Sequence, residues 1–289
     1  MAQFEIKDGI AIIPEGTTEI GEDAFYDCTS LESVTIPESV TEIGRSAFYR
    51  CASLKSITIP ESVTKIGDNA FDGCSSLESI TLPESVASIG WYAFTGCTSL
   101  KNVTLPDSVT FLGENAFSRC TSLESIAIPK SVTRIDHYVF NDCSSLKSIT
   151  IPDSVKEIGL GAFRWCTALE SVTIPESVTR IECYAFMGCT SLKDITIPKT
   201  VTRIEQNAFK GCTSLKSVTI PESVREIEEY AFEGCASLTT VILPVWMKEI
   251  NLTAFYKCPS LSTIYVPAKT TDYYKELLPE KLHDKIVEL

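Results

Sequence analysis

The stretch SLESVTIPESVTEIGRSAFYRC, residues 30–51, decides the fold, because SLKSITIPESVTKIGDNAFDGC follows at residues 53–74 as nearly the same segment. Phenylalanine recurs at the same step from Phe25 to Phe255. A fixed period between about 20 and 50 residues indicates stacked units that share one continuous core. The cysteine that ends each copy recurs every 23 residues, at Cys28, Cys51, Cys74, Cys97, Cys120, Cys143, Cys166, Cys189, Cys212, Cys235 and Cys258.

The repeat occupies almost the whole chain of 289 residues. Eleven copies of 23 residues fill 17–269, and we call them coils 1 to 11 in chain order. We therefore expect an N-terminal β-hairpin cap (1–16), eleven 23-residue repeats (17–269) and a C-terminal helical cap (270–289). No segment is left over for a second domain.

One copy divides into three short elements. Residues 33–37 (SVTIP) alternate apolar and polar side chains and are rich in β-branched residues, which predicts a strand with its apolar side facing the core. Residues 39–44 (SVTEIG) predict a second extended segment. Residues 45–51 predict a short helical turn that presents Phe48 and Cys51 to the core. Each copy is thus one coil of an α/β repeat solenoid.

The regular spacing of the cysteines favours a packing role over a chemical one. A buried thiol behaves as a small hydrophobic side chain. Zinc sites need close pairs such as Cys-x-x-Cys, and the chain has none. Only Cys183 lies outside the 23-residue spacing. We expect reduced, buried thiols, no metal and no cofactor.

The pattern C-x-S-L-x-S-[VI]-T-[IL]-P-x-S-V-T-x-I-G-x-x-A-F resembles the BspA-like, or treponemal-type, branch of bacterial leucine-rich repeats over about residues 10–274. The resemblance implies a right-handed, curved leucine-rich-repeat solenoid with a parallel sheet on its concave face and short helical turns. Members of this family are typically bacterial surface or secreted proteins, and several are associated with cell adhesion. Protein binding at the cell surface is what the resemblance implies for this chain.

Both ends carry signals of caps over the core. A favoured two-residue turn at residues 8–9 predicts a hairpin that covers coil 1 with Phe4 and Ile10. Beyond the last coil, Asp272 is placed to begin a helix, and a second helix that carries Ile286 is expected after it.

Charge and hydropathy disfavour two classes of partner. The chain has 25 basic and 38 acidic residues, a net charge of −13, which repels phosphate backbones, so we expect no nucleic acid partner. No stretch approaches 18 consecutive apolar residues, so we expect no membrane insertion. The first residues lack the basic and apolar pattern of a secretory signal, and the sequence by itself leaves the location unknown.

Catalytic motifs are missing from the sequence. Its two histidines, His137 and His283, lie far apart, and no Gly-rich phosphate loop or nucleophile elbow occurs. A general base needs an orienting partner and a pocket, and nothing in the sequence supplies them for His137. We therefore expect a protein that is not an enzyme.

The predicted concave strands alternate in charge from one copy to the next. Opposite charges on neighbouring strands stabilise each other, so this face should be flat, hydrated and self-compensating. The alternating residues are Glu32, Lys55, Glu78, Lys101, Glu124, Lys147, Glu170 and Lys193.

The residues that break the repeat are the informative ones. Interfaces concentrate Trp, Tyr and Met, although local packing would also explain isolated apolar exceptions. A second period appears among them, because Tyr92, Tyr138, Tyr184 and Tyr230 recur every 46 residues with Asn69, Asn115 and Asn207 in intervening copies. The candidate protein-binding patch consists of Trp91, Tyr92, Phe111, His137, Tyr138, Trp165, Tyr184 and Met187.

The sequence is thus interpreted as a non-catalytic, protein-binding leucine-rich-repeat module, a bacterial surface or adhesin-like protein or a fragment of one. Its partner would be a host matrix or cell-surface protein, or a second copy of the chain. A structural or consensus-designed scaffold with no natural ligand is the alternative.

Overall fold

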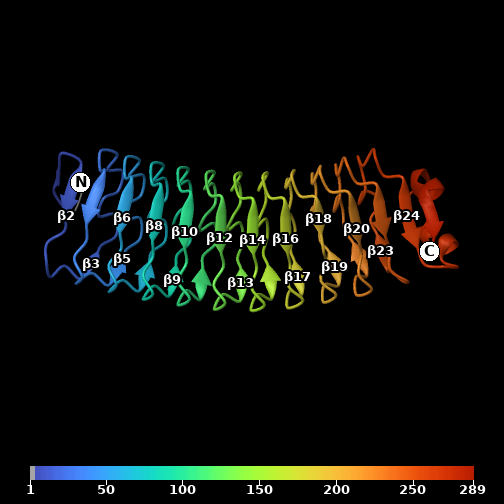
Figure 1. Cartoon of the computed structure of the whole chain (residues 1–289), viewed down its shortest axis with the longest axis horizontal. Helices are drawn as coiled ribbons and strands as arrows, with labels where there is room; N and C mark the ends of the chain where they lie inside the picture. The colour runs from blue at the N-terminus through green and yellow to red at the C-terminus, as the bar shows by residue number, and fades with distance from the viewer. Residues whose placement is uncertain (1–3) are drawn as a thin grey trace.

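The computed structural model describes residues 4–289, which form stacked coils of about 23 residues with two short strands in each coil. Figure 1 shows the coils side by side along the long axis of the molecule, with the two termini at opposite ends. Equivalent strands of neighbouring coils pair in parallel, as in Ser56 with Ser79. The predicted repeat solenoid is confirmed, and its parallel sheets run along the stack.

Each coil contributes one strand to a long ladder, in which a central residue such as Ile57 faces the core and its neighbours face out. The strands of this ladder are β2 (Ile10–Ile12), β4 (Ser33–Thr35), β6 (Ser56–Thr58), β8 (Ser79–Thr81), β10 (Asn102–Thr104), β12 (Ser125–Ala127), β14 (Ser148–Thr150), β16 (Ser171–Thr173), β18 (Asp194–Ile195), β20 (Ser217–Thr219), β22 (Thr240–Ile242), β24 (Thr263–Val266) and β25 (Ile286–Glu288).

The second extended segment of each coil forms a short ladder, in which the second residue of each strand is buried. Its strands are β3 (Glu19–Ile20), β5 (Glu42–Ile43), β7 (Lys65–Ile66), β9 (Ser88–Ile89), β11 (Phe111–Leu112), β13 (Arg134–Ile135), β15 (Glu157–Ile158), β17 (Arg180–Ile181), β19 (Arg203–Ile204), β21 (Glu226–Ile227) and β23 (Glu249–Ile250).

The segment expected as a short helical turn is a run of tight turns instead. In coil 2 the N–H of Tyr49 donates to the carbonyl oxygen of Ser46 at 3.0 Å, three residues back. Ser46 and Arg50 have positive φ angles of 52° and 55°, which a right-handed helix excludes. The N–H of Phe48 is therefore free to donate to Ala70 in the next coil, at 2.8 Å. Hydrogen bonds between coils replace those of a helix.

The core is a stack of phenylalanine rings beside a row of thiols. Successive rings from Phe25 to Phe255 lie between 5.1 and 5.9 Å apart, centre to centre. All twelve cysteines are free, which confirms the packing interpretation. Each thiol of the 23-residue spacing, from Cys51 to Cys258, also donates to the carbonyl oxygen of the phenylalanine 26 residues earlier, at 3.1 to 3.3 Å. The same carbonyl also accepts from the backbone N–H of the cysteine three residues later, as from Cys28 to Phe25 at 3.1 Å, so the thiol uses the second lone pair of the oxygen.

At the N-terminal end, β1 (Ile6–Lys7) pairs antiparallel with β2, and the ring of Phe4 stacks on Phe25 at 5.6 Å. The expectation that Ile10 covers the core was wrong, because its side chain is 49% exposed. β2 is a strand of the long ladder, and side chains alternate along it, so Ala11 faces the core instead.

The C-terminal end contains helix α1 (Thr271–Leu277) and the 3₁₀ helix η1 (Glu280–Lys285). Ile286, expected within a helix, begins strand β25, which pairs in parallel with β24. An unpaired edge would leave the backbone groups of β24 without partners, and β25 supplies them. No helix within residues 4–289 is long and apolar enough to cross a membrane.

The two ladders are interrupted at a few junctions between coils. The long ladder has no pairing between β4 and β6 or between β18 and β20, and the short ladder has none between β11 and β13 or between β17 and β19. Because β17 and β18 belong to coil 8 and β19 and β20 to coil 9, both ladders are interrupted at the junction of these two coils. Elsewhere at least one ladder continues.

A column of glycines explains where the short ladder weakens. At Gly44, Gly67 and Gly113, an added Cβ would lie less than 3.0 Å from the backbone of the previous coil. Asp136 and Glu205 fill this position at the two interruptions. Glu182 and Glu228 occupy the same position in coils 8 and 10, and their strands remain paired with the previous coil. An acidic side chain here therefore weakens the strand pairing but does not prevent it. We call this position, one per coil, the glycine column.

Candidate functional site

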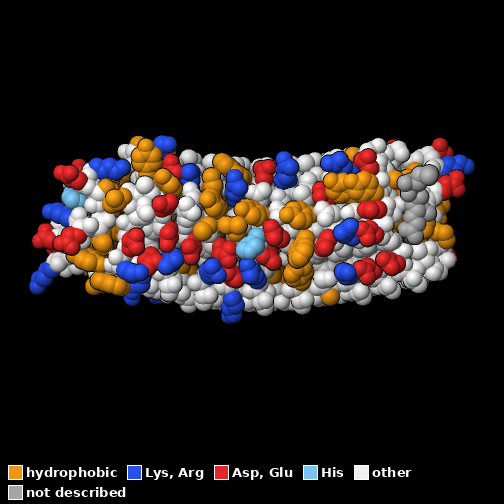
Figure 2. Space-filling view, turned by 180° about the vertical axis from the view of Figure 1, so that it is seen from behind, with side chains coloured by type: hydrophobic (Ala, Val, Ile, Leu, Met, Phe, Trp, Pro, Cys, Tyr) orange, Lys and Arg blue, Asp and Glu red, His pale blue; other side chains and the backbone are white. Residues whose placement is uncertain are grey.

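The eight pattern-breaking residues lie on the turn side of coils 4 to 8, and we call them the aromatic face. Trp91 is 54% exposed, Phe111 42% and Trp165 40%, and Tyr92 is also exposed. Figure 2 shows hydrophobic side chains gathered in the middle of one side of the molecule, among acidic and basic groups. His137, Tyr138, Tyr184 and Met187 are half-buried.

Several of these side chains stand on backbone of left-handed conformation. The φ angle is 58° at Tyr92, 56° at Tyr138 and 61° at Trp165. Glycine and asparagine adopt this region easily, whereas bulky residues do so at a cost in free energy. Glycine in the next coil makes room for two of the rings: an added Cβ at Gly161 would lie 2.4 Å from the ring of Tyr138, and one at Gly188 would lie 2.4 Å from the indole of Trp165.

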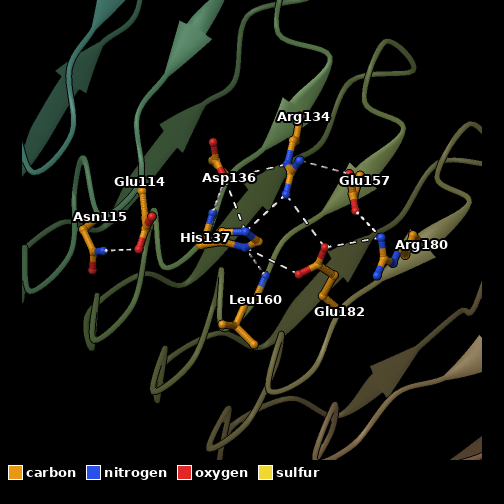
Figure 3. A network of polar contacts seen from close by, with 9 residues as sticks. All are labelled: Glu114, Asn115, Arg134, Asp136, His137, Glu157, Leu160, Arg180 and Glu182. Atoms are coloured by element: carbon orange, nitrogen blue, oxygen red, sulfur yellow. Dashed lines mark hydrogen bonds and ion pairs between the residues drawn. The ribbon is translucent and has the colours of Figure 1, made fainter.

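A network of charges lies within the aromatic face, and Figure 3 shows its members converging from coils 6, 7 and 8. Nη1 of Arg134 lies 3.4 Å from Oε2 of Glu157, and Nη1 of Arg180 lies 3.2 Å from Oε1 of the same carboxylate. Arg134 also contacts Glu182 at 3.8 Å. The His137 cluster consists of Arg134, Asp136, His137, Glu157, Arg180 and Glu182.

His137 uses both ring nitrogens within this cluster. Its Nδ1 accepts a hydrogen bond from the backbone N–H of Leu160 at 2.9 Å and lies 3.5 Å from Oε2 of Glu182. Its Nε2 lies 3.4 Å from Nη2 of Arg134. The imidazole therefore joins coil 6 to coil 7 and also contacts coil 8.

Two acids of the glycine column have raised pKa values. Burial raises the pKa of Glu182, and the hydrogen bond that its protonated carboxyl donates to Glu157 reinforces the shift, while the nearby His137 opposes it. Burial also raises the pKa of Glu205, against the opposing charge of Arg203. Carboxylates at this position are less easily ionised than they would be in water.

The sequence located the aromatic residues and His137 but missed the charged partners. Arg134, Glu157 and Arg180 occupy a position whose polar character is ordinary for a strand facing solvent. The usable signal was in the glycine column, because Asp136 and Glu182 replace a glycine found there in neighbouring coils. Substitution of a sterically required glycine by an acid marks a changed environment.

Two hollows of the surface lie at the junction of coils 8 and 9, and others lie at coils 5 and 6 and at the N-terminal end. One at the junction, of about 690 Å³, is lined along the long ladder by residues that include Ile197, Ile220 and Leu243. A second hollow of about 330 Å³ is lined by residues that include Arg180 and Glu205. Within residues 4–289, no group of three or more His, Cys, Asp or Glu is arranged to hold a metal ion.

The outer face of the long ladder is covered by ion pairs, as its alternating charges predicted. Lys55 lies 2.9 Å from Glu32, Lys147 2.9 Å from Glu124, and Lys193 2.6 Å from Glu170. The side chain of Lys147 lowers the pKa of Glu124 through a hydrogen bond. These exposed pairs neutralise one another.

The stacked parallel coils define the class of this protein, which is a leucine-rich-repeat solenoid. The family model for the BspA type leucine rich repeat region matches residues 9–120, 64–192 and 156–280. The chain therefore belongs to the BspA-type leucine-rich-repeat family, whose fold serves protein interaction. A search of the curated proteins finds no significant relative.

Solved structures of bacterial leucine-rich-repeat proteins are similar along most of the chain. A leucine-rich repeat protein from Bacteroides ovatus is 28% identical, with 97% of this chain and 92% of that one covered and a TM-score of 0.55. A leucine rich cell surface protein from Faecalibacterium prausnitzii is 33% identical, covering 92% and 80%, with a TM-score of 0.58. The Treponema pallidum leucine-rich repeat protein is 34% identical, covering 64% and 83%, with a TM-score of 0.55.

Proposed function

We propose that this chain is a non-catalytic protein-binding module of a bacterial cell surface, adhesin-like in role, and that it binds through the aromatic face. The observation that carries the proposal is the exposure of Trp91, Phe111 and Trp165 in coils 4, 5 and 7. Exposed aromatic side chains within a few coils of each other form the kind of anchor that dominates protein interfaces. The similar protein from Faecalibacterium prausnitzii is described as a cell surface protein, which supports the location.

The His137 cluster suits the polar part of such an interface. Its arginines and carboxylates pair with one another, so a partner would not have to bury an isolated charge. The long ladder offers less for recognition, because nearly the same Ser, Thr and paired charges recur from coil to coil. The partner is therefore a protein, or a second copy of this chain, that contacts the turn side.

The test replaces Trp91 and Trp165 together by Ser. Both side chains are exposed, so the circular dichroism spectrum and Tm should stay nearly unchanged. Binding to a panel of immobilised matrix proteins, and self-association measured by sedimentation, should weaken. The matched control replaces Lys101, Glu124 and Lys147 by Ala on the long ladder. Binding that survives the tryptophan change but is lost in the control would place the interface on the long ladder.

A structural or consensus-designed scaffold with no natural ligand is the second candidate. The unbroken 23-residue spacing of the coils favours it. A scaffold would bind no member of the panel and would sediment as a monomer. In that case the tryptophan variant and the unaltered protein would behave alike.

A further inference from the structure

One column of residues on the turn side alternates between large and small side chains. From coil 3 to coil 10 it reads Asn69, Tyr92, Asn115, Tyr138, Gly161, Tyr184, Asn207 and Tyr230. All eight residues have positive φ angles, between 55° and 61°. We call Tyr92, Tyr138, Tyr184 and Tyr230 the tyrosine column.

The fold does not account for the tyrosines. Left-handed backbone favours asparagine and glycine, which the intervening coils contain, whereas a tyrosine there costs free energy. Burial does not repay this cost, because Tyr92 is 39% exposed and the other three are only half-buried. Four aromatic rings are therefore held at the surface where the backbone alone would select other residues.

The contacts of Tyr138 show how a tyrosine of this column packs. The ring of Tyr138 lies against the backbone of Gly161, so close that a Cβ there would come within 2.4 Å. The Cδ1–Cε1 edge of the ring therefore packs against the next coil, while the side chain stays partly in contact with solvent. The face of an aromatic ring is electron-rich and attracts polarised C–H groups, such as those on the flat side of a sugar.

The spacing of the column selects a particular ligand geometry. Neighbouring coils are separated by 5.1 to 5.9 Å along the phenylalanine stack, close to the length of one pyranose ring in an extended chain. In a β-1,4-linked glycan each sugar is turned over relative to the last, so the same side recurs at every second sugar. Tyrosine recurs at every second coil, and the two periods coincide.

The surroundings of the column suit an uncharged polar ligand. The amide of Asn115 lies between two of the tyrosines, and its nitrogen contacts Glu114 at 3.3 Å. The charges of the neighbouring His137 cluster are paired with one another. Amide and carboxylate groups form hydrogen bonds with sugar hydroxyls. Because the charges of the cluster are paired, the ligand does not need a charge of its own.

We infer that Tyr92, Tyr138 and Tyr184 of the tyrosine column form a binding track for a linear, uncharged β-1,4-linked glycan, with a sugar stacked on a tyrosine at every second ring. The ring of Tyr230 is left out of the track, because Nζ of Lys210 already lies over it, 5.2 Å from its centre. This activity goes beyond the proposed protein binding, because it uses a different ligand class, although Tyr92, Tyr138 and Tyr184 also belong to the aromatic face. Cellulose-type and chitin-type chains share the required geometry. The two differ in the group on the second carbon, which direct binding can distinguish.

The test is isothermal titration calorimetry of the full chain with cellohexaose and with chitohexaose. Maltohexaose is the ligand control, because its α-1,4 linkages curl the chain away from a straight track. The variant replaces Tyr92, Tyr138 and Tyr184 by Asn, the residue that the same backbone carries in alternate coils. Its Tm should be equal to or above that of the unaltered protein. The matched protein control is Tyr26→Ser, which removes an exposed tyrosine outside the column.

The expected result is binding of at least one β-1,4 hexamer, no binding of maltohexaose, and a loss of affinity of about tenfold or more in the triple variant. Tyr26→Ser should bind as the unaltered protein does. No heat with either β-1,4 hexamer, or equal binding of maltohexaose, overturns the glycan track. If the triple variant instead loses a matrix-protein partner while the hexamers never bind, the tyrosines belong to the protein interface and the proposed function still stands.

Discussion

Nδ1 of His137 lies 2.9 Å from the backbone nitrogen of Leu160, and this hydrogen bond joins coil 6 to coil 7. At the equivalent position, Oδ1 of Asp68 lies 2.8 Å from the backbone nitrogen of Trp91 and joins coil 3 to coil 4. Both side chains accept a hydrogen bond from a backbone N–H of the next coil, His137 through a ring nitrogen and Asp68 through a carboxylate oxygen.

We predict that removal of the acceptor loosens the Leu160 contact and leaves the Trp91 contact in place. His137→Ala takes away Nδ1, so the backbone N–H of Leu160 loses its side-chain partner. Hydrogen exchange of the Leu160 amide, measured relative to that of Trp91, should accelerate in this variant. His137→Asp is the control and should keep the exchange slow, because Asp68 accepts the equivalent hydrogen bond. An unchanged ratio in His137→Ala would contradict the prediction.

Glu205 should make the protein less stable at neutral pH than an uncharged residue would. Burial raises the pKa of this carboxyl in the folded state. The protonated carboxyl is therefore the form that favours the folded state. Its stabilising contribution is complete below the pKa that Glu205 has in the unfolded chain, and it is lost as pH rises through the higher pKa of the folded protein. Glu205→Gln should raise the free energy of unfolding at pH 7 by less than about 1 kcal/mol, because the group is partly solvated. The gain should vanish below about pH 4.

Glu124→Gln is the control of opposite sign for this measurement. The hydrogen bond from Lys147 lowers the pKa of Glu124, so its contribution is present at neutral pH and lost as pH falls. Chemical denaturation of both variants at several pH values checks the pair. A gain from Glu205→Gln that is independent of pH would contradict the assignment to ionisation.

Replacing Asp136 by Gly and Val139 by Ala should restore the short ladder between β11 and β13. The rings of Phe117 and Phe140 are 5.9 Å apart at this junction, the widest step of the phenylalanine stack. The adjacent coils have glycine where Asp136 stands and alanine where Val139 stands, so both replacements restore the smaller side chain of the repeat. The amide of Thr133 should then become protected from hydrogen exchange, and a regained hydrogen bond contributes about 1 kcal/mol. Val139→Ala alone is the control, and unchanged exchange in the double variant would rule out the steric explanation.

Native thiol labelling should reach Cys183 and the two terminal thiols, Cys28 and Cys258, before any other cysteine. These three are half-buried, whereas the rest are buried. Burial raises the pKa of Cys51 and of Cys212 to about 12, so neither forms a reactive thiolate at neutral pH. Mass spectrometry after labelling should find twelve free thiols once the protein is denatured. Disulfides, or uniform labelling of the native protein, would contradict this.

The regular part of the structure was predictable from the sequence because each position recurs in every coil. Burial of Phe48 and Cys51 follows from the period and their apolar character, since an apolar residue kept at every step must face the shared core. The donation from Cys51 to the carbonyl of Phe25 was not predictable, because it depends on the offset between coils and not on the pattern within one. The left-handed backbone of Tyr92 was not predictable either, because asparagine and glycine indicate such a conformation in a sequence, whereas tyrosine does not.

The junction of coils 8 and 9 has a mechanical consequence. A pulling force applied between the two ends would pass from coil to coil, and at most junctions ladder hydrogen bonds help to carry the load. At this junction neither ladder is paired, and the load falls on turn contacts such as the 2.8 Å hydrogen bond from the N–H of Phe186 to Ala208. The stack would part there first, so that coils 9 to 11 separate as one block and the molecule lengthens in two steps.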